Sequence, residues 1–173
     1  MPLPCAVVVM GVAGCGKSTV GVALASQLGW PFLEGDDFHP FANIEKMSRG
    51  LPLTDSDREP WLDALGRELS ILVQAGRSTV ASCSALKAVY RERLSVGIPG
   101  GVRFVHLRAD RDELERRLRN RSGHFFDQRL LDSQLSTLES PIGEESIGID
   151  ATLPVAEIVQ EAIERLALEG TPS

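Results

Sequence analysis

Short apolar segments alternate with longer amphipathic segments along the chain, and this alternation is the first indication of its fold. The apolar segments predict strands at residues 6–10, 31–33, 78–82, 102–107 and 146–149. Several of them lack a polar residue at every second position, which is typical of strands covered on both faces. The pattern therefore predicts an α/β fold with a doubly wound, mostly parallel five-stranded sheet and helices on both faces.

Between the strands, apolar residues recur at helical spacing. Leucine stripes over 62–72, 114–118 and 131–138 predict three helices, and a longer apolar face over 155–166 predicts the last one. A polar, turn-rich insertion, which includes 43–47 and 50–62, is expected before a long helix. Asp110, with Glu113 three residues later, has the spacing of a capping box and predicts the start of the helix that carries the second stripe.

The first strand runs directly into the sequence GVAGCGKS at residues 11–18, and a helical segment follows as far as Gly29. This is the spacing of a phosphate-binding loop, in which backbone N–H groups at a helix N-terminus bind the phosphates of a nucleotide. Lys17 is expected to reach the β- and γ-phosphates, and the Ser18 hydroxyl to ligate Mg²⁺. The residues expected to contact the nucleotide are Gly11, Val12, Ala13, Gly14, Cys15, Gly16, Lys17, Ser18 and Thr19.

Cys15 lies inside this loop, ahead of a helix N-terminus and close to Lys17. Both neighbours favour the thiolate form of a cysteine. We therefore expect the Cys15 thiol to react with alkylating reagents, and we expect bound ATP to protect it.

Composition limits the classes of function. A length of 173 residues predicts a single domain over 1–173, and a net charge of −6 disfavours a surface for nucleic acid. Cys5, Cys15 and Cys83 lack the spacing of a metal site and cannot all pair with one another, so they indicate a reduced, cytoplasmic protein. No apolar stretch approaches the length of a membrane span.

The ligand site of an open parallel sheet lies at the carboxyl ends of its strands, so the residues that follow each strand are the candidates for chemistry. Asp36, Asp37 and His39 follow the second strand. A carboxylate there can accept the proton of an attacking hydroxyl or hold a water on Mg²⁺, and a surface turn is the alternative. The third strand supplies no carboxylate, so Asp36, together with Ser18, is the leading candidate for the metal.

Three cations follow that indicate an anionic acceptor. Arg58 lies near the start of a helix, where the helix dipole does not favour a positive charge, so a carboxylate of the substrate would explain its position. Lys87 and Arg91 are four residues apart, on one helical face, and are expected to support Arg58. The alternative for all three is an exposed, solvated side chain.

A segment of about 117–127 is expected to act as a lid. Arg117 and Arg121 share a helical face, and Gly123 follows them. Phosphoryl transfer needs cations over the transferring group and a cover that excludes water, and such a segment would supply both. A plain helix with exposed arginines is the alternative.

Four stretches carry a resemblance to a known family: 35–40 (GDDFHP), 55–62 (DSDREPWL), 83–87 (CSALK) and 123–126 (GHFF). Together with the phosphate loop, they resemble bacterial-type gluconokinases, the small phosphate-loop kinases that phosphorylate D-gluconate on O6 and are related to shikimate kinases. The resemblance extends over most of the chain. It implies the phosphate-loop kinase fold, ATP and Mg²⁺ as cofactors, 6-phosphogluconate as product, and a homodimer.

With this resemblance, the candidate residues fall into roles. The catalytic candidates are Lys17, Asp36 and Arg121, and the metal candidates are Ser18 and Asp36. Arg117 joins the nucleotide-binding residues. The substrate-binding candidates are Asp36, His39, Arg58, Lys87, Arg91 and His124.

Two alternatives remain at this point. One is a phosphate-loop kinase for another small hydroxylated acid such as shikimate, although shikimate kinases carry a glycine-rich turn where this chain has CSALK at 83–87. The other is a non-catalytic nucleotide-binding module, which would leave the carboxylate at Asp36 and the candidate cations without a purpose.

Overall fold

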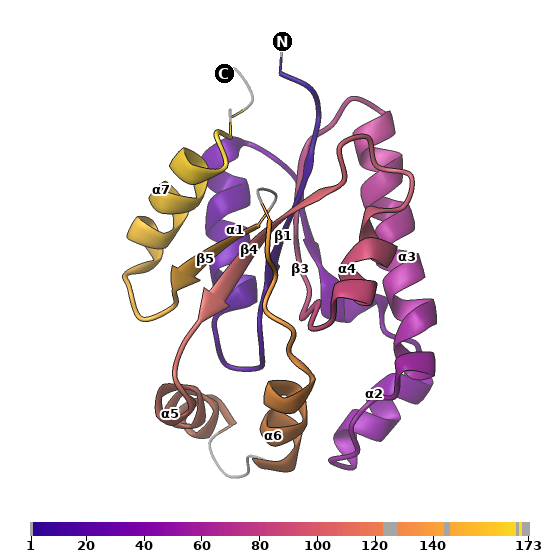
Figure 1. The fold of residues 1–173 in the computed structure, drawn as a ribbon, viewed down its shortest axis with the longest axis vertical. Helices are drawn as coiled ribbons and strands as arrows, with labels where there is room; N and C mark the ends of the chain where they lie inside the picture. Colours follow the sequence, from indigo (N-terminus) through magenta and orange to yellow (C-terminus); the bar gives the residue numbers. More distant parts are fainter. Residues whose placement is uncertain (1, 123–127, 144–145, 169, 171–173) are drawn as a thin grey trace.

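A computed structural model describes residues 2–122, 128–143, 146–168 and 170. Within these residues the chain forms a five-stranded sheet with helices on both faces (Figure 1). The strands lie in the order β2-β3-β1-β4-β5, and their pairings are parallel. Their bounds are β1 Ala6–Met10, β2 Phe32–Glu34, β3 Thr79–Ser82, β4 Val102–Arg108 and β5 Ser146–Asp150. The predicted fold class and all the predicted strands are confirmed, with ends shifted by at most one residue.

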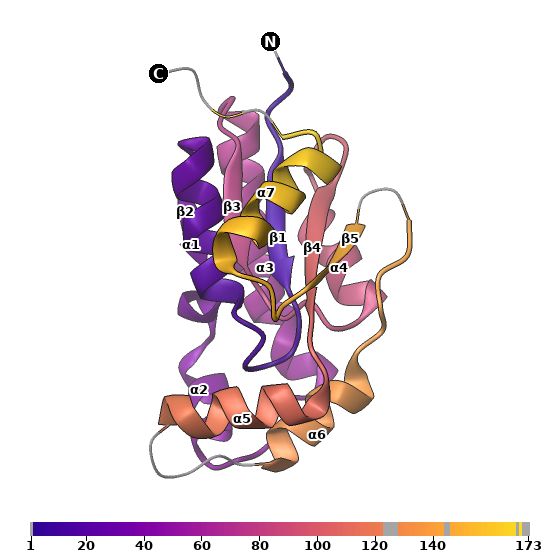
Figure 2. The same ribbon diagram turned by 90° about the vertical axis from the view of Figure 1, so that its left-hand side faces the viewer.

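Helices α1 and α7 cover one face of the sheet, and α3 and α4 cover the other (Figures 1 and 2). Helices α5 and α6 lie beyond the end of the sheet at which β1 and β4 point (Figure 2). None of the helices in the described ranges has the length and apolar character that crossing a membrane requires. The helices are α1 Lys17–Leu28, α2 Phe41–Ser48, α3 Asp55–Gln74, α4 Ala88–Ser95, α5 Arg111–Ser122, α6 Gln128–Thr137 and α7 Val155–Arg165, with a short 3₁₀ helix, η1, at Gly35–Phe38.

The central strands form the middle of the core. Every residue of β1 and of β3 is buried, which explains why neither strand shows polar alternation. The edge strand β5 differs, because Ile147 and Ile149 are buried while the residues between and around them are more exposed. The apolar stripes predicted for the helices also face this core, with Leu65, Leu69 and Leu114 fully buried.

Helix ends follow local chemistry. Helix α1 ends at Gly29, which has a left-handed φ of 68°. Asp110 accepts a hydrogen bond from the Glu113 N–H at 2.9 Å, as expected at the start of α5. Helix α3 begins earlier than its leucine stripe, because Thr54 and Asp57 form a reciprocal capping box. The segment predicted to be a turn-rich insertion therefore contains most of α2 and the first turns of α3.

Gly35 fixes the approach between the ends of two strands. It follows β2, its N–H donates to Ser82 Oγ at 3.1 Å, and its carbonyl accepts the indole N–H of Trp61 at 2.8 Å. A Cβ atom at this position would overlap the carbonyl oxygen of Ser82. Only glycine fits here, and this contact sets where the residues after β2 lie relative to the end of β3.

Gly35→Ala is therefore expected to destabilise the protein by roughly 3 kcal/mol or more, because the backbone of β3 cannot yield to the added methyl group. Gly76→Ala is the matched control. It meets nothing within 4 Å but has a φ of +77°, so it should cost only about 1 kcal/mol. Urea unfolding of both variants measures the two values, and equal small losses would contradict the close approach.

Candidate active site

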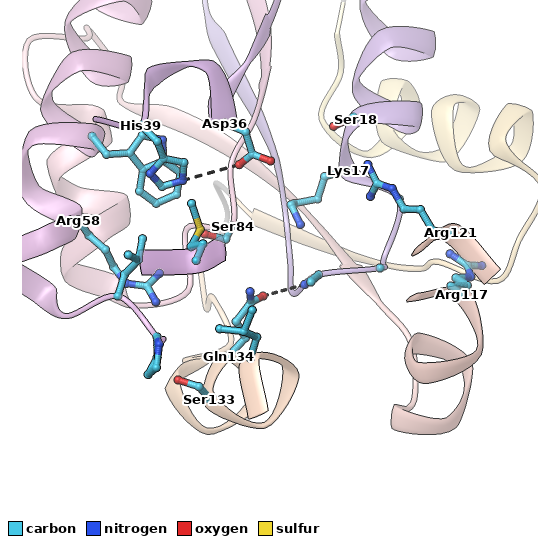
Figure 3. A pocket seen from close by; sticks show the side chains of 18 of the residues that line it. Lys17, Ser18, Asp36, His39, Arg58, Ser84, Arg117, Arg121, Ser133 and Gln134 are labelled. Carbon is cyan, nitrogen blue, oxygen red and sulfur yellow. Dashed lines mark hydrogen bonds and ion pairs between the residues drawn. The ribbon is translucent and has the colours of Figure 1, made fainter. Parts of the chain in front are cut away.

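A cavity of about 450 Å³ opens beyond the carboxyl ends of β1, β2 and β3 (Figure 3). The phosphate loop, η1 and the start of α3 line it, together with the loop between α2 and α3. Ser84, which follows β3, and one face each of α5 and α6 complete its walls. The cavity thus gathers residues from across the chain at the edge of the sheet where a ligand was expected.

The phosphate loop forms one side of the cavity. Gly11, Gly14 and Gly16 have φ values of 143°, 87° and 97°, which a residue with a side chain rarely adopts. The Lys17 ammonium donates to the Val12 carbonyl at 3.2 Å. Of the predicted nucleotide contacts in the loop, the structure places Ala13, Gly14, Gly16, Lys17, Ser18 and Thr19 on the cavity wall. Gly11, Val12 and Cys15 lie behind it and are buried.

The position of Cys15 contradicts the expectation that its thiol is reactive. Its side chain is only 1% exposed and belongs to the hydrophobic core, where its Sγ lies against Gly11. The N-terminus of α1 and the Lys17 side chain are both near Cys15 in the chain, as predicted, but the loop directs the thiol away from the cavity. The thiol is therefore inaccessible, and the loop contributes the Cys15 carbonyl instead, which accepts a hydrogen bond from Arg117 at 3.3 Å.

Asp36 and His39 lie across the cavity from the loop. Asp36 is 80% exposed, lines the cavity and lies 3.8 Å from His39 Nε2. The His39 ring stacks on Trp61 with centroids 3.9 Å apart, and burial lowers its pKa more than Asp36 raises it. Neutral His39 is thus held in place, while the Asp36 carboxylate is free to meet a ligand. Asp37 is exposed but does not line the cavity.

Arg58 lies on the cavity wall, as its predicted role requires. The residue is 7% exposed, its guanidinium lies 5.4 Å from the Tyr90 ring centroid, and it lines the cavity (Figure 3). Among the described residues its buried Nε has no hydrogen-bond partner. A buried cation with an unmet donor is costly unless an anion completes it. The site therefore suits a ligand that carries a carboxylate or phosphate at this point.

The structure does not bring Lys87 and Arg91 to the cavity, contrary to the prediction from their spacing. The Lys87 ammonium pairs with Asp55 at 3.0 Å, and the Tyr90 hydroxyl also donates to Asp55, which lowers the pKa of that carboxyl. Arg91 Nη1 donates to the carbonyls of Ala85 and Leu86 at 2.8 and 3.2 Å. Both cations thus have partners within the protein, and they stabilise the turn after β3 and its contact with the start of α3.

This scaffold includes a strained turn. Ala85 has a φ of +45°, which a residue with a Cβ atom adopts only at an energetic cost. Arg91 fixes its carbonyl, and the Gly11 N–H donates to the Ser84 carbonyl at 3.3 Å. The turn presents Ser84 to the cavity between the phosphate loop and the acceptor side.

Arg117 and Arg121 extend from α5 into the cavity wall. Arg117 is already engaged, because it donates to the carbonyls of Cys15 and Ala151, the latter at 2.7 Å, and pairs with Glu113. The predicted lid begins within α5, but residues 123–127, which include His124, lie outside the described residues. Movement of this segment stays a prediction.

Helix α6 supplies residues that the sequence reasoning missed. Gln134 Oε1 accepts a hydrogen bond from the Ala13 N–H at 2.7 Å, and Ser133 and Gln134 both line the cavity. In the sequence, both stand between the apolar residues of a helical stripe, and no motif there marks them as ligand contacts. Only the packing of α6 against the phosphate loop reveals them.

A phosphate loop that faces a carboxylate and a buried arginine across one cavity, on a doubly wound parallel sheet, defines a phosphate-loop kinase. Residues 7–141 match a protein family described as an AAA domain. A shikimate kinase from Bacteroides thetaiotaomicron, 21% identical with a TM-score of 0.63, shares the fold over 95% of this chain and 99% of its own.

Other relatives are much more similar. Gluconokinase of Gluconobacter oxydans is 52% identical over 81% of this chain and 78% of its own length, and the thermoresistant gluconokinase of Escherichia coli is 42% identical over 91% and 90%. The crystal structure of a gluconokinase from Sinorhizobium meliloti is 49% identical, with a TM-score of 0.87 over 96% of this chain and 94% of that one. The chain belongs to the gluconokinase family.

Because Cys15 and Cys83 are buried and Cys5 is only partly so, alkylation of the native protein should reach Cys5 first. Burial raises the pKa of the Cys5 thiol, so even this reaction should be slow at neutral pH. Mass spectrometry after iodoacetamide treatment, with and without urea, measures each site. Fast modification of Cys15 without urea would show that the loop opens in solution.

Proposed function

We propose that this protein is an ATP-dependent gluconokinase, which transfers the γ-phosphoryl group of ATP to O6 of D-gluconate and yields 6-phospho-D-gluconate and ADP. The main support is Arg58, a buried cation on the wall opposite the phosphate loop, whose Nε has no hydrogen-bond partner among the described residues. An acceptor with a carboxylate at one end satisfies this cation and leaves its far hydroxyl free to face the nucleotide. Membership of the gluconokinase family supports the same acceptor.

The nucleotide phosphates would lie on the phosphate loop, with Lys17 neutralising charge on the group being transferred. Ser18 and Asp36 both present oxygen atoms to the cavity, and these suit Mg²⁺, which prefers oxygen and keeps several waters and phosphate oxygens as ligands. Among the described residues, no group of three or more acidic, His or Cys side chains is placed to hold a metal ion. Bound Mg²⁺ would supply charge neutralisation at the phosphates.

On the acceptor side, Arg58 would bind the gluconate carboxylate through its planar set of N–H donors. Asp36 would orient the O6 hydroxyl and take its proton as the new P–O bond forms. His39, neutral and stacked on Trp61, would hold the acceptor side in shape and contribute a ring nitrogen. Each role follows from a side chain that already faces, or borders, the cavity.

Arg117 and Arg121 would stabilise the transferring phosphoryl group from α5, and closure of the segment with His124 would exclude water. A cytoplasmic homodimer completes the proposal. The homodimer rests on the family resemblance, and the cytoplasmic location rests on the free cysteines. A shikimate kinase is not favoured, because the shikimate kinase neighbours share only the fold at 19–21% identity.

Measuring ATP consumption in the presence of gluconate, shikimate or a nucleoside monophosphate tests this function. We expect turnover with gluconate far above that with the other acceptors. A folded Lys17→Ala variant, which lacks the charge at the γ-phosphate, should lose about 100-fold or more of this turnover. Turnover with shikimate alone, or with no acceptor at all, would contradict it.

Arg58→Ala is expected to raise the KM for gluconate about 10- to 100-fold, the effect of losing a hydrogen bond to a charged group, and to leave the KM for ATP nearly unchanged. Arg67→Ala, on the exposed side of the same helix, is the matched control and should change neither value. Steady-state kinetics with each substrate varied in turn gives both constants. An equal change in both KM values would give Arg58 a purely structural role.

Asp36→Asn is expected to lower kcat about 10²- to 10⁴-fold, because the variant keeps the size of the side chain but cannot accept a proton. Asp37→Asn is the matched control, since its carboxylate is exposed but does not line the cavity. Turnover at saturating ATP and gluconate measures the effect. Loss of turnover in Asp37→Asn, with normal turnover in Asp36→Asn, would show that Asp37 and not Asp36 has this role.

A further inference from the structure

We propose that Gln134 of α6 binds a hydroxyl group of the acceptor, and that its carboxamide links the phosphate loop to the substrate. The inference rests on the proposed function, since it concerns a polyhydroxylated acid in the same cavity. Gln134 Oε1 accepts a hydrogen bond from the Ala13 N–H, and Gln134 Nε2 would donate one to a hydroxyl oxygen of the acceptor. Helix α6 would thus contribute a substrate contact beside those of Asp36 and Arg58.

The orientation of the carboxamide follows from its partner. A backbone N–H can only donate, so the atom that meets it at 2.7 Å must be the oxygen of the Gln134 side chain. The NH₂ group is thereby directed away from the Ala13 N–H. Figure 3 shows Gln134 between the phosphate loop on one side and Arg58 on the other. Its donor therefore faces the part of the cavity where an acceptor would lie.

Two hydrogen-bonding groups of α6 lack a partner among the described residues and could bind the hydroxyl groups of a polyol. Neither Gln134 Nε2 nor Ser133 Oγ makes a hydrogen bond with any described residue, although both side chains line the cavity. These groups are neutral, whereas the charges suited to phosphate oxygens lie on Lys17 and α5. Neutral donors and acceptors match hydroxyl groups, and a site built to bind a hydroxyl rejects analogues that lack it.

The position of Gln134 is held by the protein itself. Just beyond α6, the Glu139 N–H donates to the Leu86 carbonyl at 2.7 Å, and the Glu139 carboxylate accepts the Ala88 N–H at 2.9 Å. Helix α6 is thus fixed both to the phosphate loop and to the segment that follows β3. A side chain held in this way keeps its donor in place before substrate binds.

Two substitutions separate the donor from the contact with the loop. Gln134→Glu keeps an oxygen for the Ala13 N–H but loses the amide donor, whereas Gln134→Met loses both. The proposal expects each variant to raise the KM for gluconate about fivefold or more, the effect of one lost hydrogen bond between neutral groups, with the KM for ATP changed less than twofold. Calorimetric titration of gluconate, in the presence of a non-hydrolysable ATP analogue, should show the same loss of affinity without relying on turnover.

Gln128→Met, at the first residue of the same helix, is the matched control, because the side-chain hydrogen bond that it loses within the described residues is an exposed one to Glu115. It should behave as the unaltered protein does. Normal gluconate affinity in Gln134→Glu would overturn the inference, as would a loss of ATP affinity equal to that for gluconate in both variants. If the unaltered protein neither binds nor phosphorylates gluconate, the proposed function fails and this inference with it.

Discussion

The parallel register of β1, β2 and β3 is the constraint on which the site depends. Ser82, near the end of β3, lies level with Val9 of β1 and with Glu34 of β2, so all three chains leave the sheet at the same edge. Within a few residues they form the phosphate loop, the turn before Ser84, and η1 with Asp36. The close contact between Gly35 and Ser82 then fixes η1 against the end of β3. Without this common edge, the nucleotide and acceptor sides of the cavity would not face each other.

The cations around this edge divide into two groups according to their partners. Lys87 pairs with Asp55 and Arg91 with two carbonyls, so their charges stabilise the turn after β3 and the start of α3. Arg58 lies among the same elements, yet its Nε lacks a partner in the described part of the chain. A protein tolerates such a buried charge where a ligand completes it. The difference between a structural and a ligand-binding cation is therefore visible in hydrogen-bond partners, which spacing in the sequence does not reveal.

The sequence predicted the strands and the phosphate loop well because both follow from local rules. Buried parallel strands are short apolar runs, and a phosphate loop needs glycines at fixed spacing. Prediction from the sequence failed where tertiary contacts determine the position of a side chain or the start of a helix. The polar cap of α3 looked like a turn, because Thr54 and Asp57 suit both. Cys15 is directed inward and Gln134 contacts the loop because of tertiary packing, and the partner of Lys87, Asp55, lies 32 residues away in the chain.

In the proposed site, Arg58 and Asp36 lie at the two ends of the acceptor. A crystal structure with gluconate and a non-hydrolysable ATP analogue would show both contacts at once. We expect the gluconate carboxylate within hydrogen-bond distance of the Arg58 guanidinium, and O6 between the Asp36 carboxylate and the γ-phosphate. Gluconate bound in the reverse direction, with its carboxylate toward the nucleotide and Arg58 still unpaired, would contradict it.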